Sequence, residues 1–288
     1  MRQILSKNRL NVRQEIAVKK ERKLDQFLQY AVEVEGIKFQ MVDLLFILCL
    51  FVIGLLIRLP LYPITSADYL GCLLPWMEEI RQTGGFFSLN HSISNYTSPY
   101  MYLMCLVSYV TRDNLYALKT VSVVFDYVAA LAMFLLVYEI TCNVRRSIIG
   151  MALVLLCPTV IINSAYWCQC DVIYTSFLLL SLLYFYRDDS RKSLIFMGIA
   201  FSFKLQALFF MPFLILMWLK GRTIKFCHFL YIPVMYVLTG SCLAVWQKHE
   251  RPAVDLCAAV RDVSVGNVGI PEYLCIAWRG DAGLLPCK

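Results

Sequence analysis

The stretch MVDLLFILCLFVIGLLIRLPLYPITSADY (residues 41–69) joins a long apolar run to a polar segment. Residues 41–57 fall just short of the roughly 20 residues with which a helix crosses a bilayer. Arg58, followed by a Leu-Pro pair, ends the run. Asp68 comes soon afterwards, at the start of a polar segment that extends to residue 118. We expect this junction to set the fold, with one membrane span leading into a large loop that carries the chemistry.

The composition indicates a membrane protein. Hydrophobic residues make up 59% of the 288 residues and charged residues only 16%, with a mean hydropathy of +0.63, which is far from a soluble domain. We predict an all-α polytopic membrane protein with about seven transmembrane helices. The predicted parts are a basic cytoplasmic arm (1–40), a membrane module (41–246) and an outer tail (247–288) without an assignable fold.

The net charge of +7 is carried largely by the N-terminal arm and by short loops. This pattern is typical of orientation in a bilayer, so we expect membrane lipid and not nucleic acid as a partner. In the arm, Val12, Ile16, Leu24 and Val32 recur at roughly helical spacing, which predicts an amphipathic helix. The helix is either a solvated cytoplasmic arm or one that lies on anionic lipid. No cleavable signal peptide is recognisable.

Further spans are predicted at residues 119–139, 147–162, 172–185, 193–219 and 226–246. We place the short apolar run 99–110 at the outer interface, because the basic loops near residues 145, 187–192 and 220–225 then all face the cytoplasm. Residues 59–118 become one large outer loop with juxtamembrane helices.

Two charged residues fall inside predicted spans, where a lone charge is costly and usually functional. Lys204 lies in the middle of 193–219, so we expect two short helices with a turn at 203–206 on the side of Asp68. Asp126 lies within 119–139 and requires a partner in the protein interior. Lys119, seven residues earlier, is on a similar helical face.

Nothing in the sequence predicts a metal or a bound cofactor. The twelve Cys lie mostly in apolar runs and act as small hydrophobes. Cys168 and Cys170 are separated by one residue, which matches neither zinc nor redox motifs. The outer loop has no Asp-x-Asp that could hold a divalent cation.

Five segments together resemble the membrane-integral glycosyltransferases of the C superfamily, in particular bacterial relatives of the mannosyltransferases of the dolichol and glycosylphosphatidylinositol pathways. Residues 166–171 (YWCQCD) are similar to a Trp-Gly-Gln-x-Asp pattern, with Cys168 where the pattern often has Gly. The other segments are 58–69, 76–86, 95–100 and 198–206. The resemblance implies inverting, metal-independent sugar transfer from a polyprenyl-phosphate donor. The acceptor would be a lipid-linked or cell-envelope glycan on the outer or luminal face.

Under this resemblance Asp68 is the catalytic base, although an Asp after Thr-Ser is also common as a cap. Lys204 neutralises the departing phosphate, or merely snorkels to the headgroups. Arg58 is either a second cation for the phosphate or an ordinary interfacial anchor. Gln169 and Asp171 orient the sugar or hold Lys204, and Asp171 is alternatively a helix cap.

The remaining predicted contacts to sugar or acceptor are Asn95, Tyr96, Tyr69, Trp167 and Gln206. For Asn95 and Tyr96 a simple turn is the competing explanation.

Two other classes stay open from the sequence. A transporter or flippase would also use Lys204 and Asp126, although no internal repeat is visible. Members of the superfamily commonly carry further spans after this module. The chain is therefore expected to be a short member, one half of a split enzyme completed by a partner chain, or an inactive truncated copy.

Overall fold

The computed structural model describes residues 30–34, 36–90, 93–94, 96–221 and 224–244. These residues are mostly helical, as predicted, with ten α-helices and one β-hairpin. The α-helices are α2 (Met41–Arg58), α3 (Leu74–Gln82), α4 (Ser98–Val110), α5 (Asn114–Thr141), α6 (Val144–Leu155), α7 (Pro158–Ile161), α8 (Asp171–Tyr186), α9 (Ser190–Phe203), α10 (Met211–Leu219) and α11 (Tyr231–Ala244). Short 3-10 or π segments are η1 (Leu59–Leu61), η2 (Tyr69–Leu73), η3 (Gly85–Asn90), η4 (Ile162–Tyr166), η5 (Leu205–Phe210) and η6 (Phe226–Leu230).

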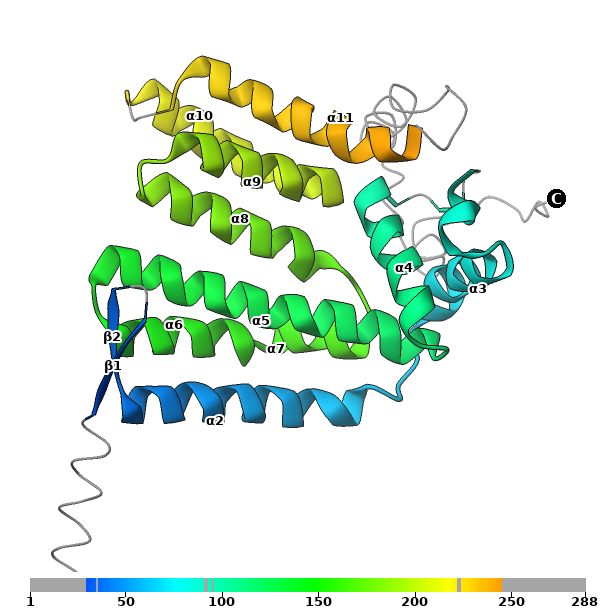
Figure 1. Ribbon diagram of the computed structural model, residues 1–288, viewed down its shortest axis with the longest axis horizontal. Helices are drawn as coiled ribbons and strands as arrows, with labels where there is room; N and C mark the ends of the chain where they lie inside the picture. Colours follow the sequence, from blue (N-terminus) through cyan, green and yellow to red (C-terminus); the bar gives the residue numbers. More distant parts are fainter. Residues whose placement is uncertain (1–29, 35, 91–92, 95, 222–223, 245–288) are drawn as a thin grey trace, which may run out of the picture.

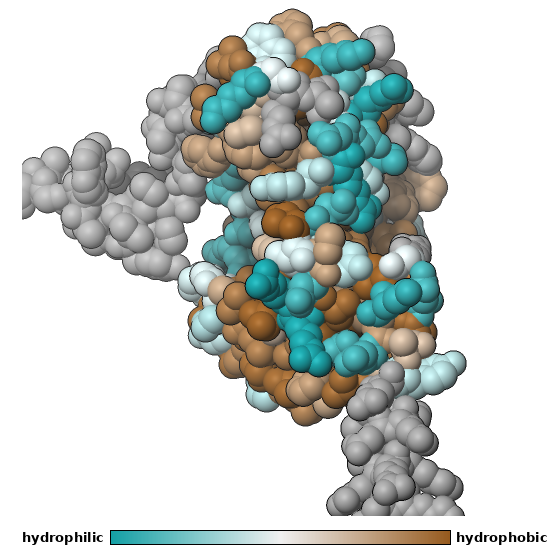
Figure 2. Space-filling model, turned by 90° about the vertical axis from the view of Figure 1, so that its left-hand side faces the viewer, coloured by the Kyte–Doolittle hydropathy of each residue, from teal (hydrophilic) through white to brown (hydrophobic). Residues whose placement is uncertain are grey.

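The long helices lie side by side with roughly antiparallel neighbours, and α3 and α4 form a cap at one end (Figure 1). α5 packs on α6 and α8, α8 on α9, and α9 on α11. The basic loops lie at the end opposite the cap, where they connect α5 to α6, α8 to α9 and α10 to α11 (Figure 1). Figure 2 shows this end of the molecule, where hydrophilic side chains gather in a band.

Two described helical stretches are long and apolar enough to cross a membrane, Met41–Leu61 and Asn114–Thr141. Val144–Leu155 and Pro158–Tyr166 are bent by 47° and make a third span if the pair is taken as one. The helices Asp171–Tyr186, Leu205–Leu219 and Phe226–Gly240 are apolar but shorter. The described residues therefore contain two or three candidate membrane-spanning helices, and the seven predicted crossings are not shown.

A β-hairpin precedes α2, so the all-α prediction is wrong at this point. β1 (Ala31–Val34) pairs antiparallel with β2 (Ile37–Gln40), and Val32 lies opposite Phe39. Gly36 supplies the turn at φ +82. Phe39 then packs on the Phe134 ring of α5. The predicted amphipathic helix is wrong for Val32, while residues 1–29 and the tail 247–288 lie outside the described residues.

Close approach of α9 and α11 depends on Gly198. A Cβ at this position would come within 2.8 Å of the Met235 Cβ and 3.1 Å of the Ile232 Cα. Small residues at such crossings let helix backbones pack tightly in membranes, where apolar burial alone does not drive association. Gly198 therefore allows α9, the helix that ends next to Lys204, to pack closely against α11.

A buried ion pair connects α2 to α5. The Arg58 Nε donates to Asp126 Oδ2 over 2.8 Å, and both side chains are fully buried. The other Arg58 nitrogens donate to the carbonyl oxygens of Gly54 and Leu155, each at 2.9 Å. Ser164 Oγ donates to Asp126 Oδ2 over 2.5 Å. Arg58 is therefore a structural residue inside the bundle, which contradicts both the phosphate-binding and the surface-anchor interpretations.

Lys119 is not the partner of Asp126. Its Nζ donates to the carbonyl oxygens of Leu61, Tyr62 and Ile64 over 2.7, 3.1 and 2.6 Å. A cation near a helix C-terminus hydrogen-bonds carbonyl groups at and just after the last turn. Lys119 therefore stabilises the conformation of the segment that leads from α2 to Asp68.

Candidate functional site

Asp68 lies in the first turn of a helical stretch, residues 67–82, and its side chain is exposed. The Ser66 Oγ accepts from the Tyr69 N–H over 3.1 Å and donates to the Trp167 carbonyl oxygen over 2.8 Å. Ser66 therefore caps this helix. The Asp68 carboxylate makes no capping hydrogen bond and is free for another role.

A chain of hydrogen bonds runs from Asp68 to Lys204. Gln169 Nε2 donates to Asp68 Oδ2 over 2.6 Å. Asn163 Nδ2 donates to both Gln169 Oε1 and Asp171 Oδ2, each at 3.1 Å. The Lys204 Nζ donates to Asp171 Oδ1 as an ion pair. Four predicted site residues thus meet in one network, bridged by an asparagine.

Both sides of this network carry π-helical turns. η2 directly follows Asp68, and η4 contains Asn163. Such turns are rare and occur frequently at functional sites. They redirect the helix so that Asn163 faces the loop with Gln169, whose backbone N–H donates to the Asn163 carbonyl oxygen over 2.9 Å.

Cys168 shapes that loop through its backbone. Its φ of +64 lies in the left-handed region that glycine adopts at low cost. This is the position at which the Trp-Gly-Gln-x-Asp pattern has glycine. The turn brings Gln169 back toward Asp68, so the conformation at residue 168 is what presents the amide to the carboxylate.

Lys204 lies at a break between two helices. α9 ends at Phe203, Lys204 is extended (φ −155, ψ 130), and η5 begins at Leu205. The predicted break at 203–206 is confirmed. The Lys204 side chain is 24% exposed and the Asp171 side chain 29% exposed, so the pair is half-buried and within reach of a ligand.

Asp171 does not cap α8 with its side chain. It is the first residue of α8, after Cys170 as N-cap. The carboxylate is also favoured there by the partial positive charge of the helix N-terminus. Of the three predicted roles for Asp171, the structure favours holding Lys204 over capping, and orienting a sugar stays a prediction.

The segment around Tyr96 is tied to the same place. Thr97 Oγ1 donates to the carbonyl oxygen of Phe203, the residue before Lys204, over 2.7 Å. The Tyr96 ring packs edge-on against Trp76, and burial raises the pKa of its phenol. The Tyr96 side chain is therefore a neutral aromatic ring beside the network.

The other predicted contacts differ in placement. Tyr69 is only 5% exposed and belongs to a hydrophobic core cluster, so its predicted contact with a sugar is not supported. Trp167 is exposed, as is Gln206 on η5. Arg58 is fully buried, paired with Asp126, and makes no hydrogen bond to the network. Asn95 lies outside the described residues.

The two cysteines beside the network have thiols of low reactivity. Cys168 and Cys170 are buried, and burial raises the pKa of each thiol to about 12. Both therefore stay protonated at neutral pH. In the part of the chain that the structure describes, no group of three His, Cys, Asp or Glu residues is arranged to hold a metal ion.

Asn163 and Ser66 were not predicted from the sequence. Asn163 ends an apolar run after two isoleucines and lies six residues before Gln169. A polar amide at the end of a span was the available signal. Its role became visible only when the helices were assembled, because a single asparagine next to a loop is usually a turn residue.

No family model, curated protein or solved structure matches the chain.

Proposed function

We propose that this protein is a membrane glycosyltransferase that moves a sugar from a polyprenyl-phosphate carrier to a lipid-linked or cell-envelope glycan. The observation that carries the proposal is the network from Asp68 through Gln169, Asn163 and Asp171 to Lys204. It joins an exposed carboxylate to a half-buried ammonium at one end of a bundle of apolar helices. Transfer from a lipid phosphate uses a positioned base and a positioned cation, and here the Gln169 amide holds the Asp68 carboxylate while the Asp171 carboxylate holds the Lys204 ammonium.

Asp68 acts as the general base. One of its oxygens accepts from Gln169, which restricts the rotation of the carboxylate, and the side chain is exposed. The acceptor hydroxyl transfers its proton to this carboxylate as its oxygen forms a bond to the anomeric carbon. The bond from that carbon to the phosphate oxygen breaks in the same displacement, so the anomeric configuration inverts.

Lys204 stabilises the phosphate that leaves. Negative charge develops on the bridging oxygen as the bond breaks, and an ammonium already in position stabilises this charge without reorganising. Asp171 is a positioning residue that keeps the Lys204 side chain at the break between α9 and η5. A polyprenyl monophosphate carries less charge than a nucleotide diphosphate, so the proposal needs neither a metal nor a cofactor.

The proposal includes a topology of about seven crossings with a cytoplasmic N-terminus and the site on the outer or luminal face. Its support is the sorting of the loops, since the basic turns lie at the end opposite the cap that carries Asp68 (Figure 1). The transporter alternative is less favoured, because the Asp126 carboxylate is fully buried and one of its oxygens already accepts from Arg58 and Ser164. A partner chain that supplies further helices remains compatible with this proposal.

The test is Asp68→Asn in membranes supplied with a labelled polyprenyl-phosphate sugar. Loss of a general base typically lowers the rate by about 10²- to 10⁴-fold. Asp113→Asn is the matched control, because Asp113 is also an exposed acid and lies just after α4. Its carboxylate accepts from the Tyr116 N–H at the N-terminus of α5, and asparagine fills this N-cap role equally well. Transfer by Asp68→Asn at the rate of the control, with equal protein levels, would remove Asp68 from the mechanism.

A further inference from the structure

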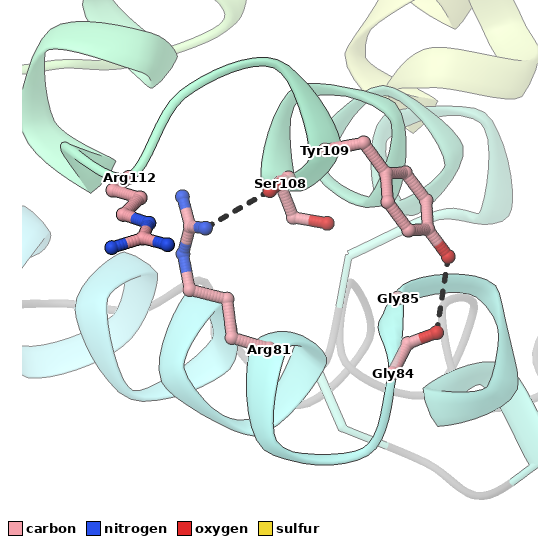
Figure 3. A pocket seen from close by; sticks show the side chains of 6 residues that line it. All are labelled: Arg81, Gly84, Gly85, Ser108, Tyr109 and Arg112. Atoms are coloured by element: carbon pink, nitrogen blue, oxygen red, sulfur yellow. Dashed lines mark hydrogen bonds between the residues drawn. The ribbon is translucent and has the colours of Figure 1, made fainter.

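A second polar feature lies in the cap, apart from the network of Asp68. A cavity of about 400 Å³ opens between the end of α3, the start of η3 and the end of α4 (Figure 3). Its lining consists of Arg81, Gly84, Gly85, Ser108, Tyr109 and Arg112. Two of these six described residues are cations and none is an acid.

Arg81 is held rigidly without being neutralised. Its Nε donates to Asn114 Oδ1 over 2.6 Å, one Nη to the Ser108 carbonyl oxygen over 2.9 Å, and the other Nη to the Thr111 carbonyl oxygen. All three acceptors are neutral. A guanidinium has five N–H donors, so two remain while the full positive charge persists.

Arg112 adds a second guanidinium beside the first. It is exposed and extends next to Arg81 (Figure 3). Two like charges at short range repel each other unless an anion lies between them. The neighbouring Asp113 accepts from the Tyr116 N–H and caps α5, and it is not part of the lining. The pair therefore presents a fork of donors suited to a planar or tetrahedral oxyanion.

The opposite wall of the cavity is preformed. The Tyr109 Oη donates to the Gly84 carbonyl oxygen over 3.0 Å and accepts from the Phe86 N–H over 3.2 Å. Gly85 has a φ of +72, and a Cβ there would lie 2.0 Å from Tyr109 Oη. Only glycine permits this contact, so the Tyr109 ring can pack directly on the Gly84–Gly85 turn.

Apolar side chains flank the lining residues in the sequence. Phe87, Leu106 and Val110 are 62%, 55% and 77% exposed. Arginines with exposed apolar neighbours at the end of a membrane-spanning bundle suit the level of lipid headgroups.

We propose that the Arg81–Arg112 cavity binds a phosphate group, carried either by an anionic lipid or by a soluble molecule. Binding here does not depend on the sugar transfer proposed above. The exposed apolar residues favour the lipid as the source. The two arginines provide bidentate, charge-assisted hydrogen bonds to the phosphate oxygens, and the cavity has room for a headgroup.

The test uses the purified full chain in detergent and two probes. Native mass spectrometry compares retention of phosphatidylglycerol with that of diacylglycerol of the same chains, and calorimetry measures binding of inorganic phosphate. Arg112→Gln is the variant, because Arg112 is exposed and its loss leaves the fold intact. Arg145→Gln is the matched control, an exposed arginine at the start of α6.

Loss of one charge-assisted contact should weaken binding roughly tenfold or more. Preferential retention of phosphatidylglycerol that falls in Arg112→Gln, but not in Arg145→Gln, assigns the site to a lipid phosphate. Inorganic phosphate binding with the same sensitivity, without lipid retention, assigns it to a soluble phosphate. Equal binding by both variants, or no binding of either probe, overturns the proposal.

Discussion

Replacing Arg58 by methionine should destabilise the protein strongly. Arg58 and Asp126 are both fully buried and joined at 2.8 Å. The variant leaves the Ser164 hydroxyl as donor to the Asp126 carboxylate, and it removes donors from the Gly54 and Leu155 carbonyl oxygens. Removing one partner of a buried ion pair costs about 3–5 kcal/mol. We expect the upper part of that range, because two carbonyl groups lose a hydrogen bond as well.

The double variant Arg58→Met/Asp126→Leu should recover most of this loss. Replacing a buried pair by apolar residues of similar volume is often neutral or stabilising. The assay is reversible unfolding in mixed micelles, followed by far-UV circular dichroism, with the four proteins of the cycle measured in parallel. Arg145→Met, at an exposed position, should change the free energy of unfolding by less than about 0.5 kcal/mol.

Two results would refute this reasoning. One is an Arg58→Met protein as stable as the parent. The other is a double variant whose loss equals the sum of the two single losses, since the residues would then not interact. If Arg58→Met weakens binding of the donor lipid and leaves the free energy of unfolding unchanged, Arg58 belongs to the substrate site, contrary to the role inferred from its burial.

Three more outcomes follow from the contacts around the site. Lys119→Met removes a charged donor from three carbonyl groups and should lower the free energy of unfolding by about 1.5–3 kcal/mol. The loss should be visible as a lower unfolding midpoint, and Lys119→Arg should recover part of it. Ser66→Ala removes a helix cap and the bond to the Trp167 carbonyl oxygen, so it should cost about 1 kcal/mol and, under the proposed function, lower transfer with unchanged membrane insertion. Because burial raises the pKa of Cys168 and Cys170 to about 12, both thiols should resist iodoacetamide at pH 8 in the folded protein and react after unfolding. Labelling of either cysteine at the rate of the exposed Cys72 would contradict that placement.

Much of the site could be read from the sequence because its signals are local. Lys204 interrupts a long apolar run, and a lone charge in the middle of a span is costly, which favours a break that places it at the membrane surface. The break follows directly, with α9 ending at Phe203 and an extended Lys204. The residue types around Gln169 and Asp171 likewise stood out against their apolar surroundings.

The partners of these residues could not be read in the same way. Gln169 meets Asp68 across 101 residues, and Arg58 meets Asp126 across 68. Residue spacing predicts which side chains share a helical face, but not which face of another helix they meet. For this reason the sequence places Lys119 on a helical face similar to that of Asp126 but does not show that Asp126 pairs with Arg58, and it does not show that Tyr69 is buried.

The sequence by itself determined that the chain is a bundle of apolar helices with a polar segment after the first, because hydropathy and charge act on each segment separately. Only the tertiary structure decided that Arg58 is buried and satisfied, that residues 31–40 form a hairpin, and that Asn163 bridges the two halves of the network. These are contacts between distant segments, and their free energy exists only once the helices have packed.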